Sequence, residues 1–340
     1  MISKLFQKIK DSEKKRPGIY IIIAVVIIAL VVVGILFLLR NDKPEKEKPK
    51  DSTISYSEIS PSNKYEPYKE ETPSAVEYDA KTSGDFNYAE VDGGAIILKY
   101  NGDKKDVTLP SQIANKPVVE IGSDIFDSDT RLENIVIPNT VKKINDYAFQ
   151  YSGIKTITIP DSVTSIGKGV FKGCAYLSSI KIPNNVKTLG AGTFSECSSL
   201  SEVTLSSSLT EISNDLFYEC GALESIVIPS NVTKIGDYAF SACAFKTAVI
   251  PDTVTEIGDH AFAFCEKLEE VRFPQSLQKV SSFAFHFCRA LKAARLPDSA
   301  KTIEQYAFYG CEALSEFKIA SDAKVGEFAL NETKFESQYK

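Results

Sequence analysis

The 340-residue chain contains no tryptophan and only two histidines. Histidine is the side chain best suited to acid–base catalysis near neutral pH and the commonest metal ligand, so its scarcity leaves little material for either. The formal net charge of -6, from 39 basic and 45 acidic residues, gives no general attraction to nucleic acid or anionic lipid. Composition therefore argues against an enzyme, and we expect no catalytic residues, no cofactor, no metal and no nucleic-acid partner.

Long apolar runs are also scarce, and the one clear example is residues 18–39 (GIYIIIAVVIIALVVVGILFLL). At ~1.5 Å per residue this run reaches ~33 Å, which is enough to cross the hydrocarbon core of a bilayer. A cleaved signal peptide would have a shorter apolar stretch ending in small residues, whereas this run ends in Leu38, Leu39 and Arg40. No cysteine follows closely to carry a lipid, so we predict an uncleaved transmembrane signal anchor.

The orientation of this anchor is predicted from its basic flanks. Basic residues lie on both sides of it, but the cluster Lys14, Lys15 and Arg16 adjoins a short N-terminal tail. Because basic residues are retained on the cytoplasmic side, we expect residues 1–17 to be a cytoplasmic tail. The chain is then a single-pass protein of the cell membrane with its C-terminal domain outside the cell.

Residues 40–84 lack a sustained apolar pattern and are rich in Lys, Glu, Pro, Ser and Thr. Such a composition buries too little apolar surface to fold, and it predicts a disordered tether. A flexible segment of this length averages about 35 Å end to end and reaches about 145 Å when fully extended. The tether is therefore expected to keep the following domain near the membrane.

An internal repeat of 22 or 23 residues dominates the rest of the chain, residues 121–330. Phenylalanine recurs at positions 126, 149, 171, 194, 217, 240, 262, 285 and 308, and Leu330 takes the next position. Proline recurs on the same lattice at positions 138, 160, 183, 229, 251, 274 and 297. A repeat this short cannot bury its own apolar side, so about nine full coils are expected to stack into a solenoid.

Each coil is predicted to contain one short strand and one turn. In Leu177, Ile180 and Ile182 the alternating apolar positions place one face of a strand in the core, and Pro183 ends that strand. The x-A-F segment predicts a short helical or 3₁₀ turn that inserts the phenylalanine. Glycine or asparagine precedes most of these segments, where we expect a positive φ. Those positions are 122, 145, 167, 190, 236, 258 and 326.

Cysteine occurs only three residues after a repeated phenylalanine, at positions 174, 197, 220, 243, 265, 288 and 311. A column of thiols could form a disulfide array or hold a soft metal. Neighbouring coils ~4.8 Å apart place Cβ atoms farther apart than the ~3.8 Å of a disulfide, and the odd count leaves one thiol over. The favoured interpretation is a column of buried free thiols.

Both ends of the stack need covering. In residues 85–120 the apolar run 95–98, a turn at 100–103 and residues 107–110 predict a hairpin-like N-terminal cap. The polar tail, residues 331–340, is expected to cover the last coil. The histidines occupy different repeat positions, His260 before Phe262 and His286 after Phe285, and we expect both at the surface or in turns.

The pattern L-x-x-I-x-I-P-x-x-V-x-x-I-G-x-x-A-F-x-x-C, together with KPVVEIG at the end of the cap, resembles the BspA-like, Treponema pallidum-type leucine-rich repeats of bacteria. The resemblance covers residues 85–330. It implies a right-handed α/β solenoid with one short parallel strand and one short helical or 3₁₀ turn per coil. It also implies a surface or secreted protein without catalytic residues, and adhesion to host matrix proteins or other bacteria. A wall-sorting signal, a lipobox and accessory modules are missing, which leaves the adhesive role open.

If the strands line an exposed face, their outward side chains form two columns. One contains residues 134, 156, 179, 202, 225, 247, 270, 293 and 316, and the other contains residues 136, 158, 181, 204, 227, 249, 272, 295 and 318. The candidate ligand-binding residues on this face are Lys181, Glu202, Val227, Val249, Glu270, Arg272, Arg295, Glu316 and Lys318. The alternative is an ordinary solvated sheet with cross-strand ion pairs.

The sequence thus favours a membrane-anchored extracellular module that binds or adheres to a protein through this face. A scaffold or accessory subunit for another membrane or cell-wall component is the second hypothesis. An enzyme is the third, because a regular columnar sequence provides no convergent acid, base and nucleophile. The ligand and the oligomeric state cannot be derived from the sequence.

Overall fold

The structure is a computed structural model that describes residues 77–338. The chain divides into the units Met1–Ala75 and Val76–Lys340, and the second unit contains all of the described residues. The predicted tail, the transmembrane segment and most of the tether therefore lie outside the described residues. No helix within residues 77–338 is long and apolar enough to cross a membrane.

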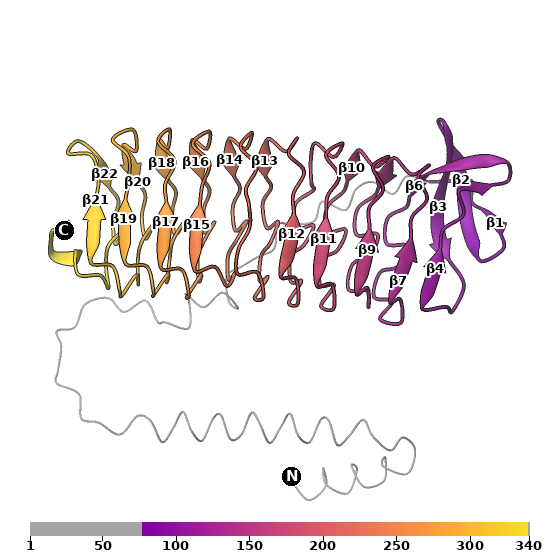
Figure 1. Cartoon of the computed structure of the whole chain (residues 1–340), viewed down its shortest axis with the longest axis horizontal. Helices are drawn as coiled ribbons and strands as arrows, with labels where there is room; N and C mark the ends of the chain where they lie inside the picture. The colour runs from indigo at the N-terminus through magenta and orange to yellow at the C-terminus, as the bar shows by residue number, and fades with distance from the viewer. Residues whose placement is uncertain (1–76, 339–340) are drawn as a thin grey trace, which may run out of the picture. The chain divides into compact units, whose positions relative to one another are not determined.

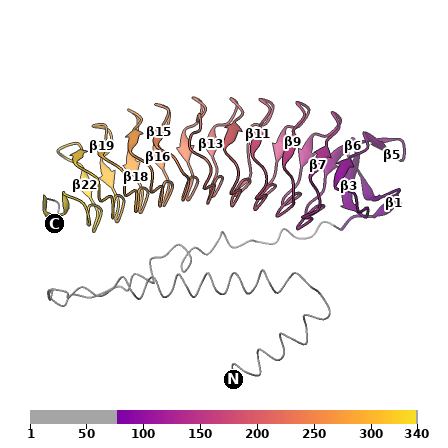
Figure 2. The same cartoon turned by 60° about the horizontal axis from the view of Figure 1, so that its bottom comes forward.

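The Val76–Lys340 unit is a stack of about ten coils that follow one another in chain order (Figures 1 and 2). A first ladder of parallel three-residue strands runs along the stack, because Leu-x-x-Ile-x-Ile segments bury alternate side chains. Its strands are β4 (Asp106–Thr108), β7 (Asn134–Val136), β9 (Thr156–Thr158), β11 (Ser179–Lys181), β12 (Glu202–Thr204), β15 (Thr247–Val249), β17 (Glu270–Arg272), β19 (Ala293–Arg295) and β21 (Glu316–Lys318). These are the predicted strands, and the predicted solenoid is confirmed.

A second ladder, which the sequence analysis did not predict, follows the proline turn of each coil. It consists of two-residue parallel strands whose second residue is buried or half-buried. Its strands are β8 (Lys143–Ile144), β10 (Ser165–Ile166), β13 (Glu211–Ile212), β14 (Lys234–Ile235), β16 (Glu256–Ile257), β18 (Lys279–Val280), β20 (Thr302–Ile303) and β22 (Lys324–Val325). Two residues are too few to show a period in the sequence. The second strand of a coil therefore could not be predicted from the alternation of apolar residues.

Both ladders are interrupted, but at different places. The first ladder lacks pairing between β9 and β11, and residues 225–227 form no strand between β12 and β15. The second ladder is reduced to an isolated bridge between Ile166 and Leu189 and starts again at β13. In the second ladder, the Ile166–Leu189 bridge spans the gap between β9 and β11. The pairing β13–β14–β16 spans the gap at residues 225–227. Where the second ladder is open, β11 pairs with β12.

The segment around each repeated phenylalanine is a hydrogen-bonded turn and not the helical turn that was predicted. Residues two before and two after the phenylalanine have a left-handed backbone, with φ of 57° at Tyr147 and 51° at Tyr151 around Phe149. This alternation aims every second amide at the next coil. Tyr147 donates to the carbonyl of Lys168 (2.8 Å), and Phe149 donates to that of Val170 (3.0 Å). A helix would keep these bonds within one coil, so inter-coil pairing replaces it. The 3₁₀ helix η2 (Glu336–Gln338) lies in the tail beyond the coils.

The glycines that precede these turns do not have the positive φ that was predicted for them. A side chain at Gly190 would instead place Cβ 2.3 Å from the carbonyl carbon of Gly167 and 2.3 Å from the amide nitrogen of Lys168. Gly167 and Gly236 also face the backbone of the preceding coil at 2.7 Å. Glycine is therefore required here by the close approach of two backbones, and the prediction of φ was wrong.

The core is a continuous file of phenylalanine rings along the stack. Neighbouring rings lie with centroids 5.2–5.7 Å apart and nearly parallel, as in Phe194–Phe217 at 5.4 Å and 11°. Phe217 is completely buried, as are most of the others. Phe245 takes the place of a leucine and contacts Phe240 edge-on at 5.5 Å. The predicted aromatic column is thus confirmed.

The N-terminal end is built differently from the predicted hairpin. The antiparallel pair is β2 (Phe86–Val91) with β3 (Gly94–Tyr100), which a turn at residues 92 and 93 connects, whereas β4 pairs in parallel with β7. The sequence Asp-Gly at this turn is a strong hairpin signal that the sequence analysis passed over. The remaining strands of this end are β1 (Lys81–Ser83), β5 (Gln112–Ile113) and β6 (Lys116–Ile121).

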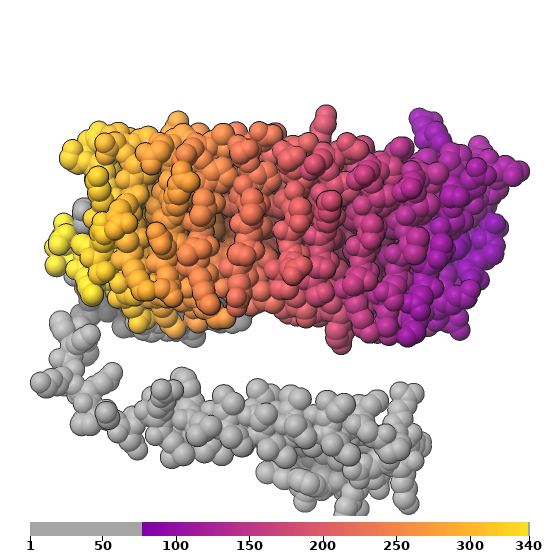
Figure 3. All heavy atoms as spheres, viewed as in Figure 1, coloured from indigo at the N-terminus to yellow at the C-terminus, as the bar shows by residue number. Residues whose placement is uncertain are grey.

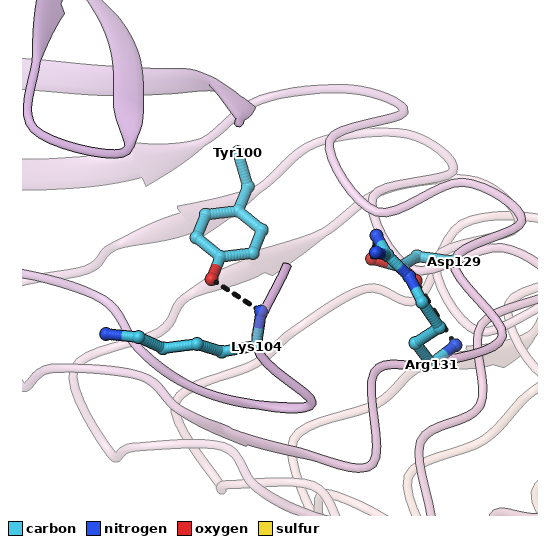
Figure 4. Close-up of polar contacts among 4 residues, drawn as sticks. All are labelled: Tyr100, Lys104, Asp129 and Arg131. Carbon is cyan, nitrogen blue, oxygen red and sulfur yellow. Dashed lines mark hydrogen bonds and ion pairs between the residues drawn. The ribbon is translucent and has the colours of Figure 1, made fainter. Parts of the chain in front are cut away.

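Tyr100 joins this end to the first coil. Its ring lies 5.6 Å from that of Phe126, which extends the aromatic file, and its hydroxyl oxygen accepts a hydrogen bond from the Lys104 amide (3.3 Å; Figure 4). Nearby, the guanidinium of Arg131 donates to both carboxylate oxygens of Asp129, at 3.1 and 3.3 Å. Tyr100 thus connects the turn between β3 and β4 to the first coil, whereas the Arg131–Asp129 pair lies within that coil. At the other end Phe335 packs on Phe317 with centroids 5.9 Å apart, as expected for a tail that covers the last coil.

Candidate functional site

The strand face, formed by the first and third residues of each first-ladder strand and of segment 225–227, is the candidate binding surface. The pattern of exposure follows the predicted columns: in Glu270–Arg272 the outer residues are exposed and the middle one is buried. The same holds for β7, β9 and β15. Figure 3 shows the coils as successive bands across one surface of the unit. The sequence-predicted site residues therefore lie on the outward side of the ladder.

The basic residues near the C-terminal end of the strand face are balanced by carboxylates. Arg295 lies across from Lys318 and donates two hydrogen bonds to the carboxylate of Glu316. This contact raises the pKa of Arg295 and lowers the pKa of Glu316. Arg272 donates to Asp252 at 3.2 Å. The predicted alternative of cross-strand ion pairs describes this part of the face, which is consequently a poor site for a purely acidic ligand.

The centre of the strand face carries no charge and contains two exposed valines. Val227 has an exposed fraction of 84%, and Val249 on the next coil has one of 57%. Ser225 and Thr247 complete the two rows. Valines this exposed are not stabilised by burial in the core. Val227 also lies where the first ladder has no strand. This central patch separates two charged regions of the face.

The candidate residues fall into three groups along the stack. Lys181 lies diagonally from Glu202, because β11 and β12 pair Lys181 with Thr204. Val227 and Val249 form the central patch. Glu270, Arg272, Arg295, Glu316 and Lys318 form the third group, with Val249 opposite Arg272 at its border. The face has no single convergent cluster, and in residues 77–338 no group of His, Cys, Asp and Glu is arranged to hold a metal ion.

The seven cysteines are free and buried, which confirms the favoured interpretation. Each thiol donates a hydrogen bond to the carbonyl of the repeated phenylalanine one coil earlier, as Cys197 does to Phe171 at 3.0 Å and Cys220 to Phe194 at 3.1 Å. That carbonyl also accepts the amide of the cysteine in its own coil, as between Cys197 and Phe194 (3.2 Å). The thiol column therefore links neighbouring coils.

Burial keeps these thiols protonated and unreactive. It raises the pKa of Cys174 to about 11 and that of Cys265 to about 12. Because the thiolate is the nucleophile, we expect no reaction with a disulfide reagent at pH ~7 in the folded protein and reaction of all seven thiols after denaturation. Titration with and without denaturant measures both. Mass evidence of a disulfide in the folded protein would contradict this prediction.

Both histidines lie in turns, as predicted, but their burial differs. His260 is a half-buried turn residue, as expected, but His286 is only 1% exposed. The His286 ring lies among aromatic rings, with centroid distances of 4.3 Å to Phe287, 5.2 Å to Phe283 and 5.4 Å to Phe264. Neither ring nitrogen has a hydrogen-bond partner within the described residues. The position directly after the repeated phenylalanine is also buried at Ser195, Tyr218 and Ser241, so the burial of His286 is shared with other coils.

Acid is expected to destabilise the fold through these histidines. Burial lowers the pKa of His286 to about 3 and that of His260 to about 4, so the unfolded chain binds the proton first as pH falls. Stability should decrease below pH ~6.5, by up to about 1.4 kcal/mol per pH unit and histidine. Urea unfolding at pH ~7 and pH ~5 measures this decrease. His286→Phe should show a smaller decrease, and an equal decrease would contradict the assignment.

Comparison with known proteins finds one matching family model and several similar solved structures. A family model described as "BspA type Leucine rich repeat region" matches residues 119–246 and 233–339, with six copies of the repeat. A solved leucine-rich repeat protein of Treponema pallidum is 26% identical, and the match covers 73% of this chain and 98% of that one, with a TM-score of 0.44.

Two further solved structures are similar over comparable lengths. A leucine-rich cell surface protein of Faecalibacterium prausnitzii is 25% identical, with 74% and 95% coverage of the two chains and a TM-score of 0.41. The pneumococcal vaccine antigen PcpA is 21% identical, with 77% and 89% coverage and a TM-score of 0.43. Comparison with curated proteins gives no match.

Proposed function

Because this chain belongs to the BspA-type leucine-rich repeat family, we propose that it is a membrane-anchored extracellular module that binds another protein through the centre of its strand face. Leucine-rich repeat proteins generally bind proteins and are typically not catalytic. The observation that carries the proposal is the central patch, where Val227 and Val249 are exposed in adjacent coils. Apolar side chains that the core does not need are typical of the centre of a protein–protein interface, with charged residues around it.

The charged groups on either side then act as a rim. Arg295 and Glu316 are already paired with each other, so a partner need not neutralise either. Such exposed pairs orient a partner and exclude wrong ones more than they add affinity. The bound partner is accordingly a protein surface with an apolar centre, and not an anionic polymer.

Binding by the central patch is tested with two exposed valines and a third as control. Val227→Asp together with Val249→Asp is expected to weaken binding of a partner captured from cell-surface or matrix extracts by at least about tenfold, because apolar contact is replaced by unpaired charge. Val136→Asp changes an equally exposed valine, 58%, in the same column outside the patch. Loss of binding in the control alone would contradict the proposal.

The anchor and its orientation are supported by residues 18–39 and the preceding basic cluster. Protease added to intact cells is expected to remove the Val76–Lys340 unit, and the N-terminal tail is expected to survive. A unit that is protected until the cells are lysed would place it in the cytoplasm and exclude the adhesive function.

A scaffold for a neighbouring membrane or wall component is the second candidate, and the short tether favours it. A disordered tether over residues 40–84, as the sequence predicts, would average about 35 Å end to end and would restrict the unit to partners close to the membrane. Crosslinking in intact cells separates the candidates, because a scaffold yields a defined partner from the same cell. An adhesin is expected to yield a partner only when host matrix or a second bacterium is added.

A further inference from the structure

A second surface, separate from the strand face, lies on the turns that follow the second ladder. Five consecutive coils have an aromatic residue three positions after the end of β14, β16, β18, β20 and β22. Figure 1 labels these strands along the second ladder. We call this row the aromatic edge, and its residues are Tyr238, His260, Phe283, Tyr306 and Phe328. The first four are half-buried and the last is 47% exposed.

The rings of the aromatic edge form one stack. Centroid distances are 4.4 Å for Tyr238–His260, 4.5 Å for His260–Phe283, 4.7 Å for Phe283–Tyr306 and 5.0 Å for Tyr306–Phe328. The first three pairs are parallel to within 9°. Each ring face is therefore covered by the next ring, and a partner meets the ring edges. This geometry disfavours sugar rings, which stack on open aromatic faces.

Backbone geometry shows that the fold does not require aromatic residues at these positions. Every residue of the aromatic edge has a left-handed φ, from 55° to 58°. A left-handed backbone costs about 1–2 kcal/mol for a residue with a Cβ and almost nothing for glycine. The equivalent positions of two earlier coils hold Gly169 and Gly192, at φ of 55° and 63°. Left-handed residues with a Cβ also occur at this position in other coils, as at Tyr147 and Asp215, so the distinctive feature of the edge is the unbroken run of five rings and not the strain.

Carboxylates border the aromatic edge. Asp237, Asp259 and Glu327 each directly precede one of its residues in the sequence, and Asp259 and Glu327 are exposed. Burial and the neighbouring carboxylates of Asp237 and Glu304 raise the pKa of Asp259. Two cations lie nearby: Lys279 pairs with Glu304 at 3.5 Å and with Glu256 at 3.8 Å, and Lys324 lines the same hollow as Glu304 and Glu327. Carboxylates still outnumber cations along the border, so a cationic partner would be attracted to it.

We propose that the aromatic edge is a docking surface for a protein segment that presents apolar side chains flanked by lysine or arginine. The apolar side chains pack against the ring edges. The basic groups pair with Asp259, Asp237 and Glu327. This surface is independent of the strand face, so either can fail without the other.

The absence of tryptophan from the chain provides a direct assay. The probe is a synthetic peptide of alternating leucine and lysine that carries one tryptophan, whose fluorescence reports binding to the Val76–Lys340 unit. That unit contains the whole described core and is used alone. The control peptide replaces every lysine by glutamate. Saturable binding of the basic peptide only is expected, and equal binding of the acidic peptide would overturn the proposal.

A variant then tests whether the rings are responsible. Tyr238→Gly, Phe283→Gly and Tyr306→Gly together leave the charge unchanged and introduce the residue that Gly169 and Gly192 show to be compatible with the fold. Affinity for the basic peptide is expected to fall at least about tenfold. The matched control is Tyr147→Gly, which lies in the same column outside the edge and should bind like the parent. Unchanged affinity of the folded triple variant would overturn the proposal.

A charge variant keeps the test decisive if the triple variant does not fold. Asp259→Asn with Glu327→Gln changes exposed groups. This double variant is expected to bind the basic peptide several-fold more weakly, and its affinity should depend less on salt concentration. Asp161→Asn with Glu224→Gln removes two carboxylates elsewhere and should have no such effect. An equal loss of peptide affinity in the two double variants would mean that binding depends only on the net charge of the protein, and it would overturn the proposal. Val227→Asp with Val249→Asp should leave peptide binding unchanged.

Discussion

Replacing Phe217 by alanine is expected to lower the free energy of unfolding by about 3–5 kcal/mol, the range for a fully buried aromatic residue. Phe217 is completely buried, and its ring stacks between those of Phe194 at 5.4 Å and Phe240 at 5.6 Å. Removing it leaves a cavity and two ring faces without a partner, at about 0.5–1.5 kcal/mol for each stacked pair within that total. The aromatic file would be interrupted in mid-stack.

Chemical denaturation measured by circular dichroism checks this expectation. Because each coil contacts mainly its neighbours, the mutant transition is also expected to broaden or separate into two steps. Tyr176→Ala is the control, since that ring is 62% exposed and its loss should change stability by less than about 0.5 kcal/mol. An unfolding curve for Phe217→Ala that coincides with the parent would contradict the stacked core.

The second large effect is expected for Gly190→Ala. The added methyl group would lie 2.3 Å from backbone atoms of Gly167 and Lys168, which cannot rotate away as a side chain can. Overpacking of this kind costs about 1–3 kcal/mol, and contact with fixed backbone places this case at the upper end. The two coils would have to separate at the start of their turns, next to the bridge between Ile166 and Leu189.

Gly192→Ala, two residues away, is the matched control. Gly192 has a positive φ of 63°, but the nearest atoms to an added Cβ are 3.7 Å away. Only backbone strain applies there, about 1 kcal/mol. Thermal unfolding of the two variants should rank Gly190→Ala as clearly the less stable. The reverse order would mean that φ, and not the approach of the coils, sets the need for glycine.

The sequence predicts the features that recur in nearly every coil. Alternation in Leu-x-x-Ile-x-Ile predicts a segment with one outward side, and it correctly places Val227 and Arg272 on the exposed face. The spacing of phenylalanine and cysteine gave the two columns. Each of these signals repeats in nearly every coil, and repetition makes the register unambiguous.

Features set by contacts between coils were not predictable in the same way. The second ladder has two residues per strand and no period, and the role of Gly190 depends on a backbone 23 positions earlier in the chain. His286 occupies a position that holds Lys172 in one coil and a buried Ser195 in another, so the residue types at this position do not indicate whether it is buried. Whether Arg295 was free or paired likewise depended on the carboxylate of Glu316 in the next coil. These outcomes required coordinates.

The staggered interruptions of the two ladders have a mechanical consequence for a protein held at one end. Tension along the stack would separate coils at the boundary with the fewest inter-coil hydrogen bonds. β13–β14–β16 bridges the opening at residues 225–227, and β11–β12 bridges the opening after Leu189. Between β9 and β11 only the isolated bridge between Ile166 and Leu189 remains, so every boundary in the described stack keeps at least one β-type pairing. Extension under force should therefore require rupture of a paired segment at every step, with first yielding expected between β9 and β11, where a single bridge remains.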